Sequence, residues 1–78
     1  SIERPVMLPG EEHRPDLVVW TADGNIEIID YKTGQENPSR YRRQVRRYMD
    51  RFAEMGYKNV RGFLWYLDSG EIVEIPFN

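Results

Sequence analysis

Two stretches in the first half of the chain combine β-branched and aromatic residues in the way that strands do. They are residues 16–21 (D-L-V-V-W-T) and 25–32 (N-I-E-I-I-D-Y-K). The three residues between them, A-D-G, are typical of a hairpin loop. A three-residue loop uses a type I turn followed by a residue in the left-handed region, which Gly24 supplies. The pattern therefore predicts an antiparallel hairpin.

The length of this loop decides which residues face one another across the hairpin. A three-residue loop places Asp16 opposite Asp30. A two-residue turn would place Asp16 opposite Tyr31 instead, with the two carboxylates on opposite faces. A slip of one residue moves every side chain of a strand to the other face. We favour the three-residue loop, and the register decides whether the two carboxylates can form a site.

The second half of the chain predicts one amphipathic helix and two further strands. Asn37 is a good helix cap, Pro38 suits the first helical position, and Gly56 is the expected end. Residues 60–67 and 71–77 then predict two strands joined by a turn. The apolar stripe of the helix recurs at spacings of three and four: Tyr41, Val45, Tyr48, Phe52 and Met55.

The order of elements predicts the fold class. Residues 3–8 contain Val6-Met7-Leu8 between two prolines, which favours a short edge strand, and residues 10–14 predict a polar loop. The order is then βββαββ. A right-handed crossover through the helix should place strand 60–67 parallel to a strand of the hairpin. The prediction is an α+β (α/β-like) fold with a mixed sheet of about five strands and one helix.

Composition limits the class of protein. The 78 residues suffice for a single domain, and the start at Ser1 without methionine leads us to expect a partial domain, 1–78, excised from a larger protein. The absence of cysteine excludes disulfides and iron–sulfur clusters and fits a cytoplasmic, reducing setting. No stretch is apolar for long enough to span a bilayer, so we expect no membrane partner.

Arginines concentrate on the predicted helix although the net charge is only −2. Six of the nine arginines fall between positions 40 and 51. Four of them form one helical stripe: Arg40, Arg43, Arg47 and Arg51. Such a stripe is usually a solvated face. Beside a site that cleaves nucleic acid it could instead contact phosphates.

Candidate chemistry centres on Asp30 and Lys32, which share a strand face while Tyr31 points the other way. Alone, this triplet is most often an exposed ion pair. The facing Asp16 changes the interpretation, because its Cβ would lie about 4.5–5.5 Å from that of Asp30. Two carboxylates that close repel one another unless a cation or proton intervenes. Oxygen ligands of this kind suit Mg²⁺ or Mn²⁺.

Two helix residues could complete this site. Gln44 and Tyr48 are four residues apart and therefore lie on one helix face. Tyr48 can equally be a core residue, because it belongs to the apolar stripe. Gln44 can equally be an ordinary solvated residue at the edge of that stripe.

Together these segments resemble a known family. The strings R-P-D-L-V-V-W, I-E-I-I-D-Y-K-T-G and Y-R-R-Q-V-R-R-Y, in this order, resemble the PD-(D/E)xK nuclease superfamily. They are most similar to the RecB-type nuclease domain of helicase–nuclease proteins, in particular the AddA-like branch. The later string G-Y-K-N-V-R-G-F-L-W-Y is similar to the tail of such domains. The resemblance implies a truncated restriction-endonuclease-like core.

The resemblance also implies roles for single residues. Asp16 and Asp30 would bind the metal together with the backbone carbonyl of Tyr31, and Lys32 would orient or activate the attacking water. The Q-x-x-x-Y motif of this family would correspond to Gln44 and Tyr48, which support the site and approach the DNA. Arg40, Arg43 and Arg47 are further candidates for DNA binding.

The implied function is Mg²⁺-dependent hydrolysis of DNA phosphodiester bonds by an (exo)deoxyribonuclease of DNA repair or recombination, with endo- and exonuclease action both left open. The partners would be DNA and the helicase region of the same parent chain. One departure is that no helix long enough to carry the family's upstream metal ligand precedes Asp16; His13, Glu11 and Glu12 are too close to serve. Two alternatives remain: a non-catalytic DNA-binding or structural module with the nuclease fold, and a small domain whose D-x-K is only an ion pair, which requires the two-residue turn.

Both faces of the predicted hairpin are apolar. One face carries Val18 and Ile28, and the other carries Leu17, Val19 and Ile29. A single helix covers one face of a sheet, and a large exposed apolar patch is rare in a soluble monomer. In the parent protein the family's upstream helix would cover the second face and contribute the absent metal ligand, so we expect this fragment to be weak or inactive by itself. We also expect it to form a homodimer that covers the second face.

Overall fold

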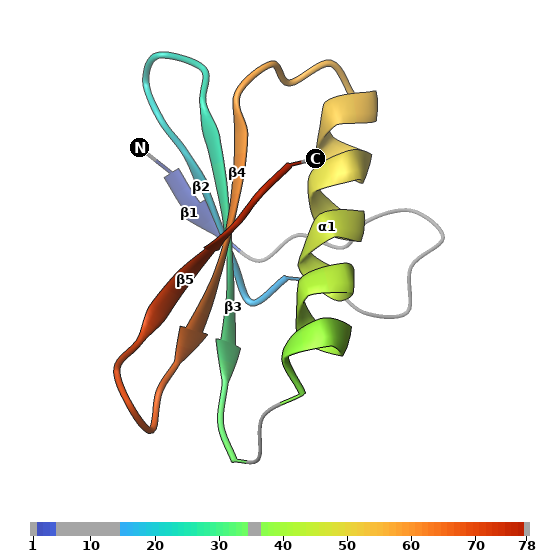
Figure 1. Cartoon of the computed structure of the whole chain (residues 1–78). Helices are drawn as coiled ribbons and strands as arrows, with labels where there is room; N and C mark the ends of the chain where they lie inside the picture. Colours follow the sequence, from blue (N-terminus) through green and yellow to red (C-terminus); the bar gives the residue numbers. More distant parts are fainter. Residues whose placement is uncertain (1, 5–14, 35–36, 78) are drawn as a thin grey trace.

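The computed structural model describes residues 2–4, 15–34 and 37–77. They form one five-stranded mixed sheet whose strands lie in chain order, with a helix packed against one face (Figure 1). This arrangement is the predicted α+β fold. The elements are β1 (Ile2–Arg4), β2 (Leu17–Trp20), β3 (Ile26–Lys32), α1 (Pro38–Glu54), β4 (Val60–Tyr66) and β5 (Ile72–Ile75).

The β2–β3 hairpin has the register that the three-residue loop requires. Leu17 pairs with Ile29, which makes Asp16 the residue opposite Asp30. Gly24 closes the turn by donating to a carbonyl three residues earlier, at 3.1 Å, and has a left-handed φ of 86°. The two-residue turn is therefore ruled out, and with it the arrangement that would separate the two carboxylates.

The edge strand lies at the very start of the chain. β1 pairs antiparallel with β2 and has no other neighbour among the described strands. It covers only the beginning of the segment in which we expected a strand. The remainder of that segment and the predicted loop over residues 10–14 lie outside the described residues.

Helix α1 begins and ends with the caps that the sequence predicts. The Asn37 side chain accepts a hydrogen bond from the Arg40 N–H at 3.4 Å, which satisfies one of the free donors of the first turn. Gly56 has a φ of 102°, and its N–H and that of the next residue donate back to the last turn, as in a Schellman motif. No helix among the described residues is long and apolar enough to cross a membrane.

The crossover through α1 places β4 parallel to β3, as predicted. In this register Asp30 lies beside Leu64, and Lys32 lies beside Tyr66. Both neighbours are buried on the side of the sheet that α1 covers. The crossover therefore puts Asp30 and Lys32 at the carboxyl end of the central strand, beneath the helix.

Four helix residues fill the space above the sheet: Val45, Tyr48, Met49 and Phe52. The predicted stripe is correct except at its end, where Met55 is 51% exposed. Met55 is the C-cap and lies beyond the last turn, so it does not face the sheet. Met49, four residues after Val45, is buried instead and packs above Gly62.

The opposite face of the sheet bears no helix among the described elements (Figure 1). It carries half-buried apolar side chains, including Leu17, Val19 and Ile29, and an exposed Tyr31. The prediction that one helix covers one face is confirmed for the described residues. The homodimer that would cover the other face stays a prediction.

Gly62 is required where α1 approaches β4 most closely. A Cβ at this position would lie 2.6 Å from Val45 Cγ1 and 2.6 Å from Met49 Sδ. Methionine can turn aside, but the valine side chain is stiff at χ1. We expect Gly62→Ala to lower the free energy of unfolding by about 1–3 kcal/mol, the usual cost of overpacking a core. Urea denaturation measures this change.

The control for this prediction is the same substitution in a Val45→Ala background. There the added methyl group enters space that the valine has vacated, so the penalty should shrink or change sign. Equal penalties in the two backgrounds would mean that Val45 does not set the approach of the helix.

Candidate active site

Asp30 is a buried carboxylate at the end of the central strand, with only 3% of its surface exposed. The Lys32 Nζ lies 3.1 Å from its Oδ2, and the Asp16 backbone N–H donates to its Oδ1 at 3.3 Å. Burial of a charge is costly unless the charge has partners. Asp30 therefore depends on its neighbours along β3 and across the hairpin.

Asp16 meets Asp30 across the hairpin, at the start of β2. Its exposed side chain turns toward β3, where Oδ2 accepts a hydrogen bond from the Tyr31 N–H at 2.8 Å. The two arms of the hairpin are thus linked twice here, since the Asp30 carboxylate accepts from the Asp16 N–H and the Asp16 carboxylate accepts from the Tyr31 N–H. The predicted convergence of Asp16, Asp30 and Lys32 is confirmed.

Lys32 is held from both the sheet and the helix. Its Nζ donates to Gln44 Oε1 at 2.9 Å and lies 4.5 Å from the centre of the Tyr41 ring. Only 18% of the Lys32 side chain is exposed. Gln44 is therefore a partner of the lysine, and its interpretation as an ordinary solvated residue is wrong.

Tyr41 is the contact that the sequence analysis missed. The helical spacing predicts only that it belongs to the apolar stripe. Its position three residues before Gln44 was a usable signal, because residues three apart share a helix face.

The remaining predicted site residues lie at different depths. Tyr48 is in the core with 2% of its surface exposed, as the core interpretation expected. The Tyr31 side chain points away from the helix and packs against Trp65, with ring centres 5.6 Å apart. Only the backbone of Tyr31 therefore reaches the site.

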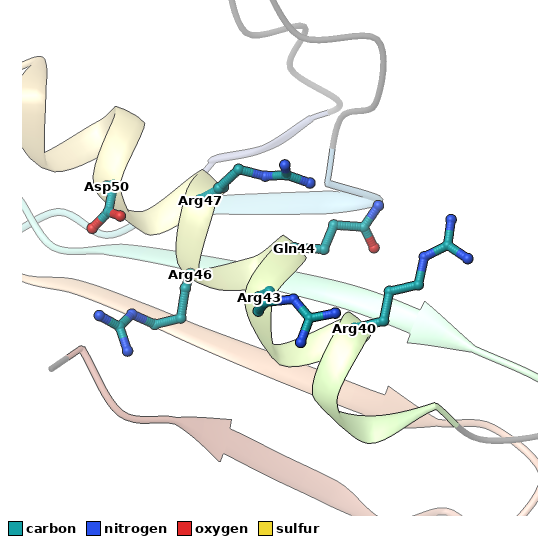
Figure 2. Close-up of a pocket in the computed structure, with 6 residues that line it drawn as sticks. All are labelled: Arg40, Arg43, Gln44, Arg46, Arg47 and Asp50. Carbon is teal, nitrogen blue, oxygen red and sulfur yellow. The ribbon is translucent and has the colours of Figure 1, made fainter.

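Four of the six arginines of α1 line a groove of about 700 Å³ next to this site (Figure 2). Four arginines and a single aspartate surround it, so the groove is positively charged. Gln44 lines the groove and also accepts a hydrogen bond from Lys32, so this one side chain belongs to both. Arg51 is not among the lining residues and pairs with Glu54 instead. The residues that line the groove are Arg40, Arg43, Gln44, Arg46, Arg47 and Asp50.

The surroundings of Asp30 disfavour the ionised form of its side chain. Burial raises the pKa of Asp30, the neighbouring Lys32 lowers it, and Asp16 raises it further; burial is the largest effect and the net shift is upward. Asp30 Oδ2 is also buried with no aligned hydrogen-bond donor among the described residues, although the Lys32 ammonium is near. The carboxylate therefore lacks part of the compensation that a charge requires.

A divalent cation would supply that compensation. Mg²⁺ typically takes one or two protein carboxylates and completes its shell with water and substrate phosphates. Within the described ranges, no three His, Cys, Asp or Glu residues cluster as a metal site, so the protein ligands here amount to an aspartate pair. The residues present fit such an ion.

The hairpin brings Pro15-Asp16, just before β2, next to Asp30-Tyr31-Lys32 at the end of β3. A model of the PD-(D/E)XK nuclease superfamily matches residues 12–76. The match spans most of the chain, and the protein belongs to this superfamily. Its nucleases generally use divalent metals, and the fold implies a DNA substrate. Searches of curated proteins and of solved structures gave no match.

The raised pKa of Asp30 predicts a pH-dependent cost to stability without metal. When the pKa of a carboxyl group is higher in the folded state than in the unfolded state, ionisation of that group destabilises the fold. The fold therefore carries this cost at neutral pH. The cost disappears as the pH falls below the ordinary value of 3.8. We expect Asp30→Asn to raise the urea midpoint at pH 7 in EDTA, with a smaller gain at acid pH.

Asp50→Asn is the matched control, because Asp50 is an exposed carboxylate on α1. Its substitution should change the free energy of unfolding by no more than about 0.5 kcal/mol. A loss of stability in Asp30→Asn at pH 7 would show that the Lys32 ion pair outweighs the burial cost.

Proposed function

We propose that this chain is the active-site core of a Mg²⁺-dependent deoxyribonuclease that hydrolyses DNA phosphodiester bonds. The observation that supports this most is the aspartate pair beside Lys32, held together by the hairpin register. A mere ion pair would leave Asp16 without a reason to face Asp30. Membership of the superfamily supports the same chemistry.

Asp16, Asp30 and the backbone carbonyl of Tyr31 would hold Mg²⁺ or Mn²⁺. When bound, such an ion polarises a phosphoryl oxygen and lowers the pKa of a bound water. The two aspartates contribute negative charge from neighbouring strands, at positions fixed by their backbone hydrogen bonds. This rigid placement favours a hard cation of defined geometry.

Lys32 would orient the attacking water and offset negative charge that develops on the phosphate. Its ammonium is already located beside Asp30, and Gln44 keeps it there through a 2.9 Å hydrogen bond. Charged donors that are fixed before the reaction lower its barrier because they need no rearrangement. Tyr48 would act indirectly, by anchoring in the core the helix turn that follows Gln44.

The arginine groove would bind the DNA backbone. Arg40, Arg43 and Arg47 are exposed, and they lie next to Gln44 along one side of α1 (Figure 2). Contacts of arginine with phosphate oxygens position nucleic acid without reading its sequence. The groove would thus place a DNA strand next to the candidate catalytic residues.

The finer function rests on the resemblance of the sequence strings. We propose a RecB-type, AddA-like exonuclease domain near the C-terminal end of a cytoplasmic helicase–nuclease that acts in DNA repair or recombination. An upstream His or Glu of the full-length protein would complete the metal ligands. The isolated 78-residue chain would then be weak or inactive, and activity should be measured in the full-length protein.

Lys32→Ala in the full-length protein tests the catalytic assignment. We expect cleavage of linear DNA with Mg²⁺ to fall by at least about 100-fold, within the range for loss of a positioned proton-transfer or charge-stabilising group. Binding of Mg²⁺ and of DNA should change little, because Lys32 is not a proposed ligand of the ion and does not line the groove.

Lys58→Ala is the matched control, since Lys58 is exposed in the connection between α1 and β4. It should cleave as the unaltered protein does. Full activity of Lys32→Ala would remove Lys32 from the mechanism. A protein that binds DNA but never cleaves it would be the non-catalytic module.

Arg43→Ala combined with Arg47→Ala tests the groove. Each lost phosphate contact lowers the slope of log affinity against log salt by about 0.9 on duplex DNA, so the slope should flatten by about 1.8. Fluorescence anisotropy at several salt concentrations measures it. Arg51→Ala on the same helix is the control and should leave the slope unchanged. An unaltered slope in the double variant would mean that the arginines are only a solvated face.

A further inference from the structure

Tyr41 lies where the helix comes closest to the end of β3. The centre of its ring is 4.5 Å from Lys32 Nζ. Its ring also lies 6.5 Å from that of Tyr66, measured between ring centres, and Tyr66 is buried and pairs with Lys32 in the parallel ladder. The ring therefore packs between the ammonium and the aromatic side chain next to it on the sheet.

The Lys32 ammonium has three N–H donors and no acceptor. Three groups face it among the described residues: the Asp30 carboxylate at 3.1 Å, the Gln44 carbonyl oxygen at 2.9 Å and the Tyr41 ring. These groups differ in what they would do during the proposed reaction. Asp30 would be shared with a cation, and its hold on the ammonium would weaken. Gln44 and Tyr41 have no other assigned role in the chemistry.

We propose that Tyr41 is a positioning residue whose ring keeps the Lys32 ammonium in place while Asp30 is engaged with a cation. The inference rests on the proposed function. The face of an aromatic ring attracts a cation through its negative quadrupole and needs no hydrogen atom in a fixed direction. The ring thus restrains the ammonium and leaves its N–H groups free to bind water or phosphate. Gln44, by contrast, already accepts a hydrogen bond from one of the three ammonium N–H groups.

The contact can be measured without any activity. The chain contains two lysines, Lys32 and Lys58, so ¹³C-labelled lysine gives two side-chain signals in its NMR spectrum. The ring current of Tyr41 should displace the ε-methylene signal of Lys32, while the exposed Lys58 serves as an internal reference. We expect Tyr41→Phe to keep the displacement and Tyr41→Leu to lose most of it, both in EDTA and in Mg²⁺.

The kinetic test uses the full-length protein with Mg²⁺ and linear DNA. We expect Tyr41→Leu to lower kcat about 2- to 30-fold, the range that a cation–π contact provides, with the KM for DNA unchanged. Tyr41→Phe should restore kcat, because it retains the ring and loses only the hydroxyl group. A general structural defect would affect KM and stability as well. If Tyr41→Leu does not fold, Tyr41→Met provides a second apolar side chain without a ring.

The outcomes separate this inference from the proposed function. Equal kcat values for Tyr41→Leu and Tyr41→Phe, or a Lys32 signal that does not move in Tyr41→Leu, would overturn the role of Tyr41. If the unaltered full-length protein does not cleave DNA, the proposed function fails, and the NMR result still decides whether the ring holds the ammonium. Loss of the Lys32 displacement together with a lowered kcat, both restored by phenylalanine, would establish the positioning role.

Discussion

The pairing register of the β2–β3 hairpin is the constraint on which the candidate site depends. Strand side chains alternate between faces, so a shift of one residue would place Asp16 and Asp30 on opposite sides of the sheet. The three-residue loop ending in Gly24 sets the register that brings them together. The backbone hydrogen bonds of the two aspartates then hold this end of the hairpin closed. The turn at one end of the hairpin thus determines whether Asp16 and Asp30 can form a site at its other end.

The buried position of Asp30 illustrates how a site can oppose the stability of its own fold. Burial raises the pKa of Asp30, and Asp16 adds repulsion, while Lys32 compensates only in part. A cation would relieve both effects at once, and binding to the folded state alone would stabilise the protein. The burial and the facing Asp16 that make the Asp30 carboxylate costly without metal would therefore favour a bound cation.

Helix α1 connects the core, the candidate site and the arginine groove. Its buried side packs so closely on β4 that only glycine fits at position 62. That close approach brings Tyr41 and Gln44 to Lys32, and the same helix turns present Arg43 and Arg47 to the groove. Packing at the core therefore sets the distance between the lysine and the surface that would receive DNA. The helix would couple stability to the proposed function through these side chains.

Local rules in the sequence determined the hairpin strands, the two strands after the helix and both helix caps, and they favoured the loop that places Asp16 opposite Asp30. Each of these follows from alternation, turn chemistry or capping within a few residues. Only the tertiary structure decided that Gln44 and Tyr41 contact Lys32 and that Met49, not Met55, enters the core. These contacts depend on where the helix crosses the sheet and how deeply it packs. No local pattern encodes that placement, because it results from the fit of side chains that are far apart in the chain.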